Sequence, residues 1–251
     1  MAFLEKILGK IIQKLWPEKI PEFAAEMYIQ LAKGAKTQFY KAVAKEIIER
    51  VESRRNVWNL LDVGTGPGFM LFEIADLADD LELVGIDLSE KLINFAKGES
   101  EKRSYGDIHF EIGDANHLDF KDNVCDFIIS SGVLHSLKNP SAAIREWLRV
   151  LRPGHDLWIY DPTVLNTEEE AKNPEHLKKI FEDMGKTLAS KKDRFIFRFM
   201  RAISDFSNLP PHPMSLADIK KIIFVAGLEN LASCVYIENR RNYLKIEIVK
   251  K

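Results

Sequence analysis

The chain has 251 residues, of which 46% are hydrophobic and 29% are charged, with 36 lysines and arginines against 38 acids. This is the composition of a globular protein, and 10 prolines and 13 glycines exclude a collagen-like or low-complexity chain. The net charge of -2 disfavours a polybasic protein that binds nucleic acid or anionic membranes.

The first predicted element is a helix over residues 4–15, because apolar residues recur there at helical spacing. Charged residues interrupt this apolar stretch, so it resembles neither a secretory signal nor a membrane span. We therefore expect a cytoplasmic protein. The helix over residues 4–15 is expected either to mediate dimerisation or to contact a membrane surface. Two further helices are predicted, one over residues 22–33 and one that begins at Thr37.

From residue 57 onward, short apolar segments alternate with segments of helical length. The predicted strands are 57–63, 81–86, 107–112, 124–130 and 156–160, and the predicted helices between them are 68–77, 90–97 and 141–151. This alternation predicts a parallel sheet covered by helices on both faces. Cys125 and Cys234 both lie in apolar stretches, so we expect buried free thiols, and no Cys/His cluster indicates a metal site.

After Asp161 the alternation stops. Residues 162–213 have a charged, helical character, and nine lysines and arginines against four acids over 172–201 give a basic face. That face is either a solvated helix surface or a surface for an anionic partner. Ser215 is predicted to cap a helix that ends before Gly227, and two strands follow over 231–237 and 243–249. Their short link requires antiparallel pairing, so the sheet is predicted to be mostly parallel with one antiparallel strand.

The sharpest local feature is the glycine loop from Asp62 to Gly68, directly after the first strand of the alternation. Glycines let the backbone turn tightly and approach a ligand, and the carboxyl edge of a parallel sheet is where such folds bind ligands. Asp87 ends the next strand, where an acid can accept hydrogen bonds from ribose hydroxyls or cap the following helix. Asp114 follows the third strand, where it can accept from an exocyclic amine or serve only in a turn.

These segments resemble a known family. LLDVGTGPG, LVGIDLSEKLINFAK, IGDANHLDF and CDFIISSGVLHSLKNPSAAIREWLRVLRPG are similar to four successive motifs of class I S-adenosylmethionine-dependent methyltransferases. The similarity is closest to the small-molecule group that includes the ubiquinone and menaquinone methyltransferases. It implies a Rossmann-like, doubly wound α/β fold with a seven-stranded sheet, and it says little about residues 1–50 or 162–213.

The resemblance also implies roles for individual residues toward S-adenosyl-L-methionine. The glycine loop would wrap the methionine part of the cofactor, the acid after the second strand would hold the ribose, and the acid after the third would meet the adenine amine. The implied cofactor-binding residues are Asp62, Gly64, Thr65, Gly66, Gly68, Asp87, Leu88, Asp114, Ala115 and Ser131.

Methyl transfer from a sulfonium mainly requires alignment, and a general base is needed only when the acceptor carries a proton. His135 is the candidate base, because imidazole titrates near neutrality, and a positioning or purely structural histidine is the alternative. Tyr160 and Asp161 end the fifth strand at the same edge. The sequence after the fourth strand, Ser130-Ser131-Gly132-Val133, lacks the pattern of nucleobase amine methyltransferases, so a small-molecule acceptor is predicted.

We predict a single methyltransferase domain with four parts: a helical extension over 1–56, a cofactor-binding core over 57–161, a helical insert or lid over 162–213, and a last helix with two strands over 214–251. The extension and the insert are expected to shape the acceptor site. A homodimer stays open, and no metal is expected. Two alternatives remain, an NAD(P)-dependent oxidoreductase and a non-catalytic S-adenosylmethionine-binding protein. Phe69 stands where the oxidoreductase motif has glycine or alanine.

Overall fold

The computed structural model of the protein describes residues 18, 20, 22–35, 37–54, 56–57, 59–106, 108–162, 191, 194, 214, 216–240 and 243–251. The predicted helix over 4–15 and most of the predicted insert over 162–213 lie outside these residues, as does the predicted cap Ser215.

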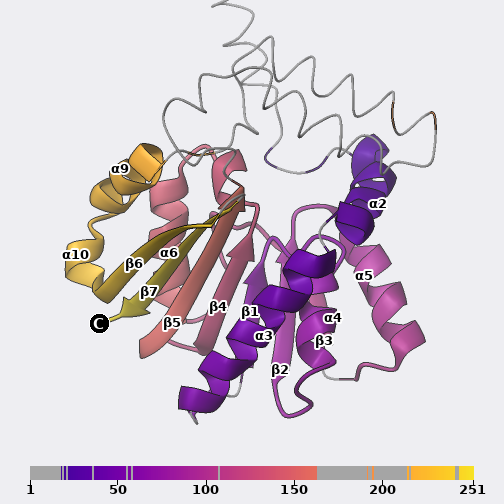
Figure 1. The fold of residues 1–251 in the computed structure, drawn as a ribbon, viewed down its shortest axis with the longest axis horizontal. Helices are drawn as coiled ribbons and strands as arrows, with labels where there is room; N and C mark the ends of the chain where they lie inside the picture. Colours follow the sequence, from indigo (N-terminus) through magenta and orange to yellow (C-terminus); the bar gives the residue numbers. More distant parts are fainter. Residues whose placement is uncertain are drawn as a thin grey trace, which may run out of the picture.

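The described residues form a seven-stranded sheet with helices packed on both faces, which confirms the predicted Rossmann-like α/β fold (Figure 1). The strand order is β3-β2-β1-β4-β5-β7-β6. Strands β1 to β5 pair in parallel, and β7 runs antiparallel to both β5 and β6. The bounds are β1 (Asn59–Val63), β2 (Glu82–Asp87), β3 (Ile108–Ile112), β4 (Cys125–Ser131), β5 (Leu151–Pro162), β6 (Ala232–Arg240) and β7 (Tyr243–Lys250).

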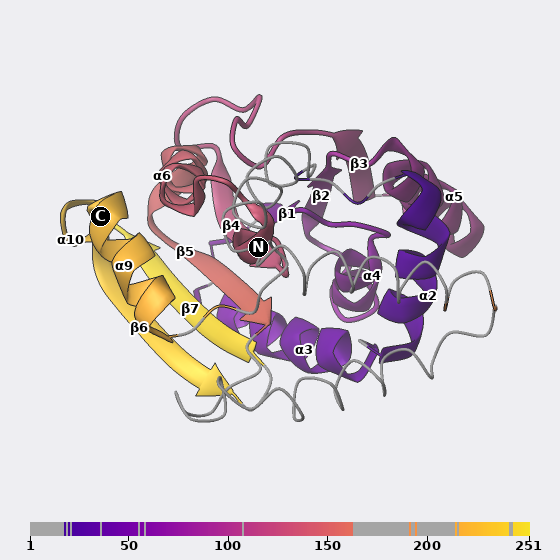
Figure 2. The same ribbon diagram turned by 90° about the horizontal axis from the view of Figure 1, so that it is seen from above.

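The helices divide between the two faces of the sheet, as the view from above shows (Figure 2). The first face carries α3 (Thr37–Arg54), α4 (Phe69–Ala75) and α5 (Glu90–Arg103), and the second carries α6 (Pro140–Val150) and α9 (Leu216–Ala226). Three short helices, η1 (Glu22–Ala24), η2 (Leu134–Ser136) and α10 (Leu228–Leu231), and the helix α2 (Ala25–Ala35) complete the described elements. None of the described helices is long and apolar enough to cross a membrane.

Burial along the strands follows their place in the sheet. The central strands β1 and β4 are almost wholly buried, as their continuous apolar sequences predict for strands covered on both faces. The edge strand β3 instead alternates at first and exposes Ile112. Cys125 is a buried free thiol, and burial raises its pKa to about 12; the side chain of Cys234 lies outside the described set.

Several predicted boundaries are wrong. The helix predicted over 68–77 is α4, which ends at Ala75, and the strand predicted from residue 57 begins at Asn59. Strand β5 begins at Leu151 rather than Asp156, and its register with β4 shifts where Gly154 adopts a φ of +80°. Helix α5 continues to Arg103 instead of ending at residue 97. Leu231 belongs to α10 rather than to the following strand. Gly227 does stop α9 as predicted, with a φ of +67°.

Candidate functional site

The carboxyl ends of the parallel strands lie together at one edge of the sheet, and the predicted site residues follow them. The glycine loop follows β1, Asp87 ends β2, Asp114 follows β3, and Ser131 ends β4. Because β1 lies between β2 and β4, the loop after β1 is flanked by the ends of both neighbours. The fold therefore gathers segments that are distant in sequence.

The glycine loop has a backbone that other residues would strain. Gly64, Gly66 and Gly68 have φ values of +76°, +56° and +79°. A Cβ atom at Gly64 would lie 2.1 Å from Val133 Cγ2, and one at Gly68 would lie 2.7 Å from the Phe110 ring. The amides of Gly64 and Thr65 donate to the carbonyl of Ile86, at 2.8 and 2.9 Å. The loop is thus held against β2 and against the turn after β4.

Asp87 joins the three loops. Its Oδ2 accepts from the Gly66 amide at 3.0 Å, and its Oδ1 accepts from the Ser89 amide at 2.8 Å. Its backbone carbonyl accepts from Gly113 at 3.1 Å. The cap position of α5 belongs to Ser89, so Asp87 does not cap that helix. Burial raises the pKa of Asp87, and the two amide hydrogen bonds oppose the rise.

Unpartnered polar atoms cluster around this loop. Within the described residues, four buried side-chain polar atoms make no hydrogen bond of ordinary geometry, and three of them, Asp62 Oδ1, Thr65 Oγ1 and Ser89 Oγ, belong to this region. Buried polar atoms are normally satisfied, so such a group points to a missing ligand. These residues therefore fit a polar nucleoside ligand of the kind that the sequence implies. Leu88, next to them, is partly buried.

Asp62 has a strongly perturbed environment. Its side chain is 2% exposed. Burial raises its pKa to about 7, the nearby negative charge of Asp87 adds to the rise, and the Thr65 hydroxyl opposes it. A buried carboxyl that titrates near neutrality is a common feature of functional sites.

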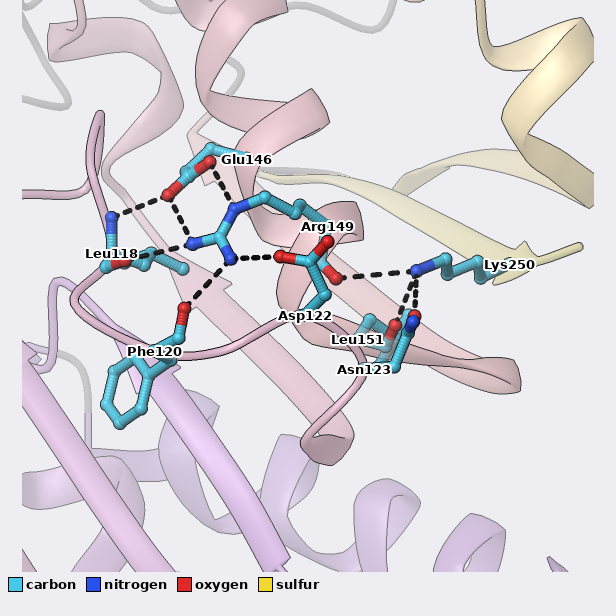
Figure 3. Close-up of polar contacts among 8 residues, drawn as sticks. All are labelled: Leu118, Phe120, Asp122, Asn123, Glu146, Arg149, Leu151 and Lys250. Atoms are coloured by element: carbon cyan, nitrogen blue, oxygen red, sulfur yellow. Dashed lines mark hydrogen bonds and ion pairs between the residues drawn. The ribbon is translucent and has the colours of Figure 1, made fainter.

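The loop after β3 is fixed from α6. Asp114 Oδ1 accepts from the Asn116 amide at 2.8 Å, so Asp114 does serve in a turn. Trp147 Nε1 of α6 donates to the carbonyl of Ala115 at 2.7 Å. Further along, Arg149 binds Glu146, Asp122 and the carbonyls of Leu118 and Phe120 (Figure 3). Asp114 and Ala115 are therefore positioned by the hydrogen bonds with Asn116 and Trp147, and the Arg149 contacts hold the chain that follows them.

After β4 the chain turns at Gly132, whose amide donates to the Tyr160 carbonyl at 2.7 Å. His135 lies in η2, and its Nδ1 is 2.9 Å from Oδ1 of Asp161, which is fully buried. The His135 amide also donates to Asp161 Oδ2 at 3.2 Å. Tyr160 is buried instead, with its hydroxyl 3.3 Å from Glu46 Oε2 on α3. The imidazole is thus oriented by an acid, whereas Tyr160 belongs to the packing against α3.

The N-terminal segment contributes residues that the sequence analysis missed. Glu18 accepts from the Lys138 amide at 2.7 Å and from Asn116 Nδ2 at 3.0 Å, so its carboxylate joins the loops after β3 and β4. A Cβ atom at Gly66 would lie 3.4 Å from the Tyr28 ring of α2. No local motif marks either residue, because both depend on where the fold places the segment.

Comparisons with known proteins agree on one family. A family model described as a methyltransferase domain matches residues 56–209. The 27-O-demethylrifamycin SV methyltransferase of Amycolatopsis mediterranei is 35% identical over 103 residues, which cover 41% of this chain and 38% of that protein. The biotin biosynthesis bifunctional protein BioHC of Cellvibrio japonicus is 27% identical over 119 residues, which cover 47% of this chain and 22% of that protein. The chain spans less than half the length of these curated relatives.

The fold also has close structural counterparts. A Methanococcus maripaludis protein assigned as an S-adenosyl-L-methionine-dependent methyltransferase superposes with a TM-score of 0.66 at 19% identity, covering 94% of this chain and 97% of that chain. At this identity the likeness concerns the fold alone. Together with the family match, it favours the methyltransferase interpretation over the oxidoreductase alternative.

Proposed function

The chain belongs to the family of class I S-adenosylmethionine-dependent methyltransferases, and we propose that it transfers a methyl group from this cofactor to a small-molecule acceptor. One observation carries the proposal beyond the family match. Asp62, Thr65 and Ser89 keep buried polar atoms that make no hydrogen bond of ordinary geometry, around a glycine loop that is hydrogen-bonded to Asp87. A polar ligand would supply hydrogen-bond partners for these atoms, whereas a turn with only a structural role would normally have its buried polar atoms paired within the protein.

The proposed cofactor contacts divide among the loops. The glycine loop, with Asp62 and Thr65, holds the methionine end; Asp87 and Leu88 hold the ribose and pack on the adenine; Asp114 and Ala115 meet the adenine, and Ser131 lies near the methionine end. When bound, the cofactor supplies an activated methyl on a sulfonium, which the acceptor's lone pair takes in line while the carbon–sulfur electron pair leaves with S-adenosylhomocysteine. The protein's share of catalysis is alignment and exclusion of water.

His135 is the proposed general base. Asp161 accepts from its backbone amide and lies 2.9 Å from Nδ1, so a proton on Nδ1 would be held there and the Nε2 lone pair would be free to take the acceptor's proton. Such a base serves a hydroxyl or an amine acceptor. His135→Gln should then lower kcat by at least about hundredfold with little change in cofactor affinity. An equal loss in cofactor binding would assign His135 a positioning role instead.

The acceptor is proposed to bind between the core, 57–161, and the two outer parts, 1–56 and 162–213, which with 214–251 complete a single domain. The proposed membership of the ubiquinone and menaquinone group would imply an organic acceptor with a hydroxyl or an activated carbon. We also propose a cytoplasmic location. A homodimer stays open, and sedimentation can decide between one and two copies of the chain.

The proposal is tested by calorimetric titration with S-adenosylhomocysteine and, in parallel, with NAD. We expect binding of S-adenosylhomocysteine and none of NAD; the reverse would establish the oxidoreductase alternative. Release of S-adenosylhomocysteine is then followed against a panel of phenols, amines and activated carbon acids. Binding without turnover on any class of acceptor would favour the non-catalytic alternative, because the family has no universal catalytic residue.

A further inference from the structure

We propose that capture of the cofactor is coupled to the release of a proton from Asp62, so that this buried acid makes cofactor affinity depend on pH. The inference rests on the proposed function, because it requires that the methionine end of the cofactor lies at the glycine loop. It goes beyond that function because it assigns a change of protonation to a residue that takes no part in the transfer of the methyl group.

The location of Asp62 leaves its carboxyl group without a counter-charge. It lies on β1, between Gly85 of β2 and Ile129 of β4, neither of which carries a charge. Its Oδ1 is buried without a hydrogen-bond partner, and within the described residues no ion pair involves it. The ionisable group that acts on it is Asp87, which is also acidic. The Thr65 hydroxyl lies close enough to oppose the rise in the pKa of Asp62, but it is neutral and supplies no counter-charge.

Other buried acids of the protein differ in this respect. Asp156 is 1% exposed and is paired with Arg50 and Arg54 of α3. Asp126 is 1% exposed and is paired with Arg152. Asp161 is fully buried and faces the imidazole of His135. Among these four, Asp62 alone has no basic partner within the part of the chain that the structure describes.

A buried carboxyl without a counter-charge holds its proton, because ionisation would place an unpaired charge in an apolar surrounding. This is the physical origin of a pKa of about 7 for Asp62 in the ligand-free protein. Near neutral pH the side chain is therefore a mixture of the neutral acid and the carboxylate. The site is poised at the pH where a small electrostatic change shifts that mixture.

The methionine end of the cofactor carries an ammonium group, which is the counter-charge that Asp62 lacks. A cation beside the acid favours its ionised form, so binding should drive the O–H bond of the neutral acid to break. The electron pair stays on the carboxylate, and the proton goes to solvent. By linkage, a site that loses a proton on binding must bind more tightly as the pH rises.

The test uses the whole protein and S-adenosylhomocysteine, which has the same ammonium group. Titrations at one pH in two buffers with different ionisation heats give the number of protons released. At pH 7 we expect release of about half a proton, and between pH 8 and pH 6 the dissociation constant should rise about tenfold, as a group titrating near 7 requires. No release, with a dissociation constant that does not change over this range, would overturn the inference.

A second ligand separates Asp62 from Asp87. Methylthioadenosine keeps the adenine and ribose but lacks the amino acid part, so it should bind without releasing the Asp62 proton. Equal proton release with both ligands would assign the effect to Asp87 at the ribose and would overturn the inference. This comparison needs no variant, so it holds even if a substitution at Asp62 prevents folding.

Variants then locate the proton. Asp62→Asn removes the ionisable group at constant shape and should abolish most of the release. Asp126→Asn is the matched control, because Asp126 is a buried acid near the amino end of β4, at the edge of the sheet opposite the glycine loop, and should leave the release unchanged. Release that survives in Asp62→Asn would contradict the proposal. If S-adenosylhomocysteine fails to bind the wild-type protein at every pH, the proposed function itself is wrong, which separates the two failures.

Discussion

Two polar regions of the molecule differ in how completely their polar groups are paired. In the α6 cluster, which consists of Arg149, Glu146, Asp122, Leu118 and Phe120, the guanidinium makes five hydrogen bonds of 2.6 to 3.0 Å (Figure 3). Glu146 also accepts from the Leu118 amide at 2.8 Å, and its pKa is lowered, chiefly by the hydrogen bond from Arg149. Donors and acceptors are matched within the protein itself.

The glycine-loop region leaves its buried groups incomplete instead. Asp62, Thr65 and Ser89 each have a buried polar atom that makes no hydrogen bond of ordinary geometry, and the pKa of Asp62 is raised rather than lowered. A satisfied network stabilises a fold, whereas an unsatisfied one costs stability that a ligand can return. The contrast indicates that the α6 cluster stabilises the fold, whereas the glycine-loop region is organised to bind a ligand.

The largest expected effect breaks the satisfied region. Arg149→Met removes the donors and leaves Glu146 and two backbone carbonyls without them, which should lower the free energy of unfolding by about 2–3 kcal/mol. Urea denaturation measures this. Lys102→Met, which breaks the exposed pair with Glu99, is the control and should cost no more than about 0.5 kcal/mol. Equal losses of unfolding free energy in Arg149→Met and Lys102→Met would show that the α6 cluster stabilises the fold no more than an exposed ion pair does.

The next effect has the opposite sign and concerns the unsatisfied region. The folded-state pKa of Asp62, about 7, lies above its ordinary value of 3.8, so the ligand-free protein loses stability as the pH rises between these values and none further above them. Asp62→Asn cannot ionise, and at pH 8 it should exceed the wild type in stability by a few kcal/mol, since each unit of the raised pKa corresponds to about 1.4 kcal/mol.

That gain should vanish near pH 4, where the wild-type acid is protonated in both the folded and the unfolded states. Denaturant titrations of both proteins at pH 4 and pH 8 measure the difference. A constant offset between wild type and Asp62→Asn at the two pH values would show that Asp62 does not hold a proton in the folded state.

A third substitution tests whether the loops act as one site. Asp87→Ala should weaken binding of S-adenosylhomocysteine at least tenfold, because charge-assisted hydrogen bonds worth roughly 1.5–3 kcal/mol are lost. Asp114→Ala, at the next strand end, is the companion measurement and should weaken binding less, because it removes one hydrogen bond from the exocyclic amine, whereas Asp87→Ala removes two from the ribose hydroxyls. Unchanged affinity in a folded Asp87→Ala protein would remove Asp87 from the site.

The sequence could predict the sheet and the order of its loops because those depend on local patterns. The continuous apolar residues of β4 and the glycines after β1 mark their own places, and Asp87 and Asp114 follow strand ends that can be identified directly. The partners could not be predicted in this way. The pairing of His135 with Asp161, and the missing partner of Asp62, depend on contacts between elements far apart in the chain.

Glu18 is the strongest example of such a contact and carries the smallest expected effect. Its carboxylate joins the Lys138 amide and the Asn116 side chain, so it ties the loop after β3 to the turn after β4 across the edge where the cofactor is proposed to bind. Loss of these two hydrogen bonds in Glu18→Ala should weaken S-adenosylhomocysteine binding about fivefold, or about 1 kcal/mol. We expect the loss mainly as faster dissociation of the ligand, measured by stopped-flow displacement, because the two hydrogen bonds of Glu18 restrain loops that must separate for release.

Glu26→Ala, which changes an exposed glutamate of α2, is the matched control. If both variants release the ligand at the wild-type rate, Glu18 only anchors the N-terminal segment. The proposed cofactor site would then not extend to the contacts of Glu18 with the loops after β3 and β4.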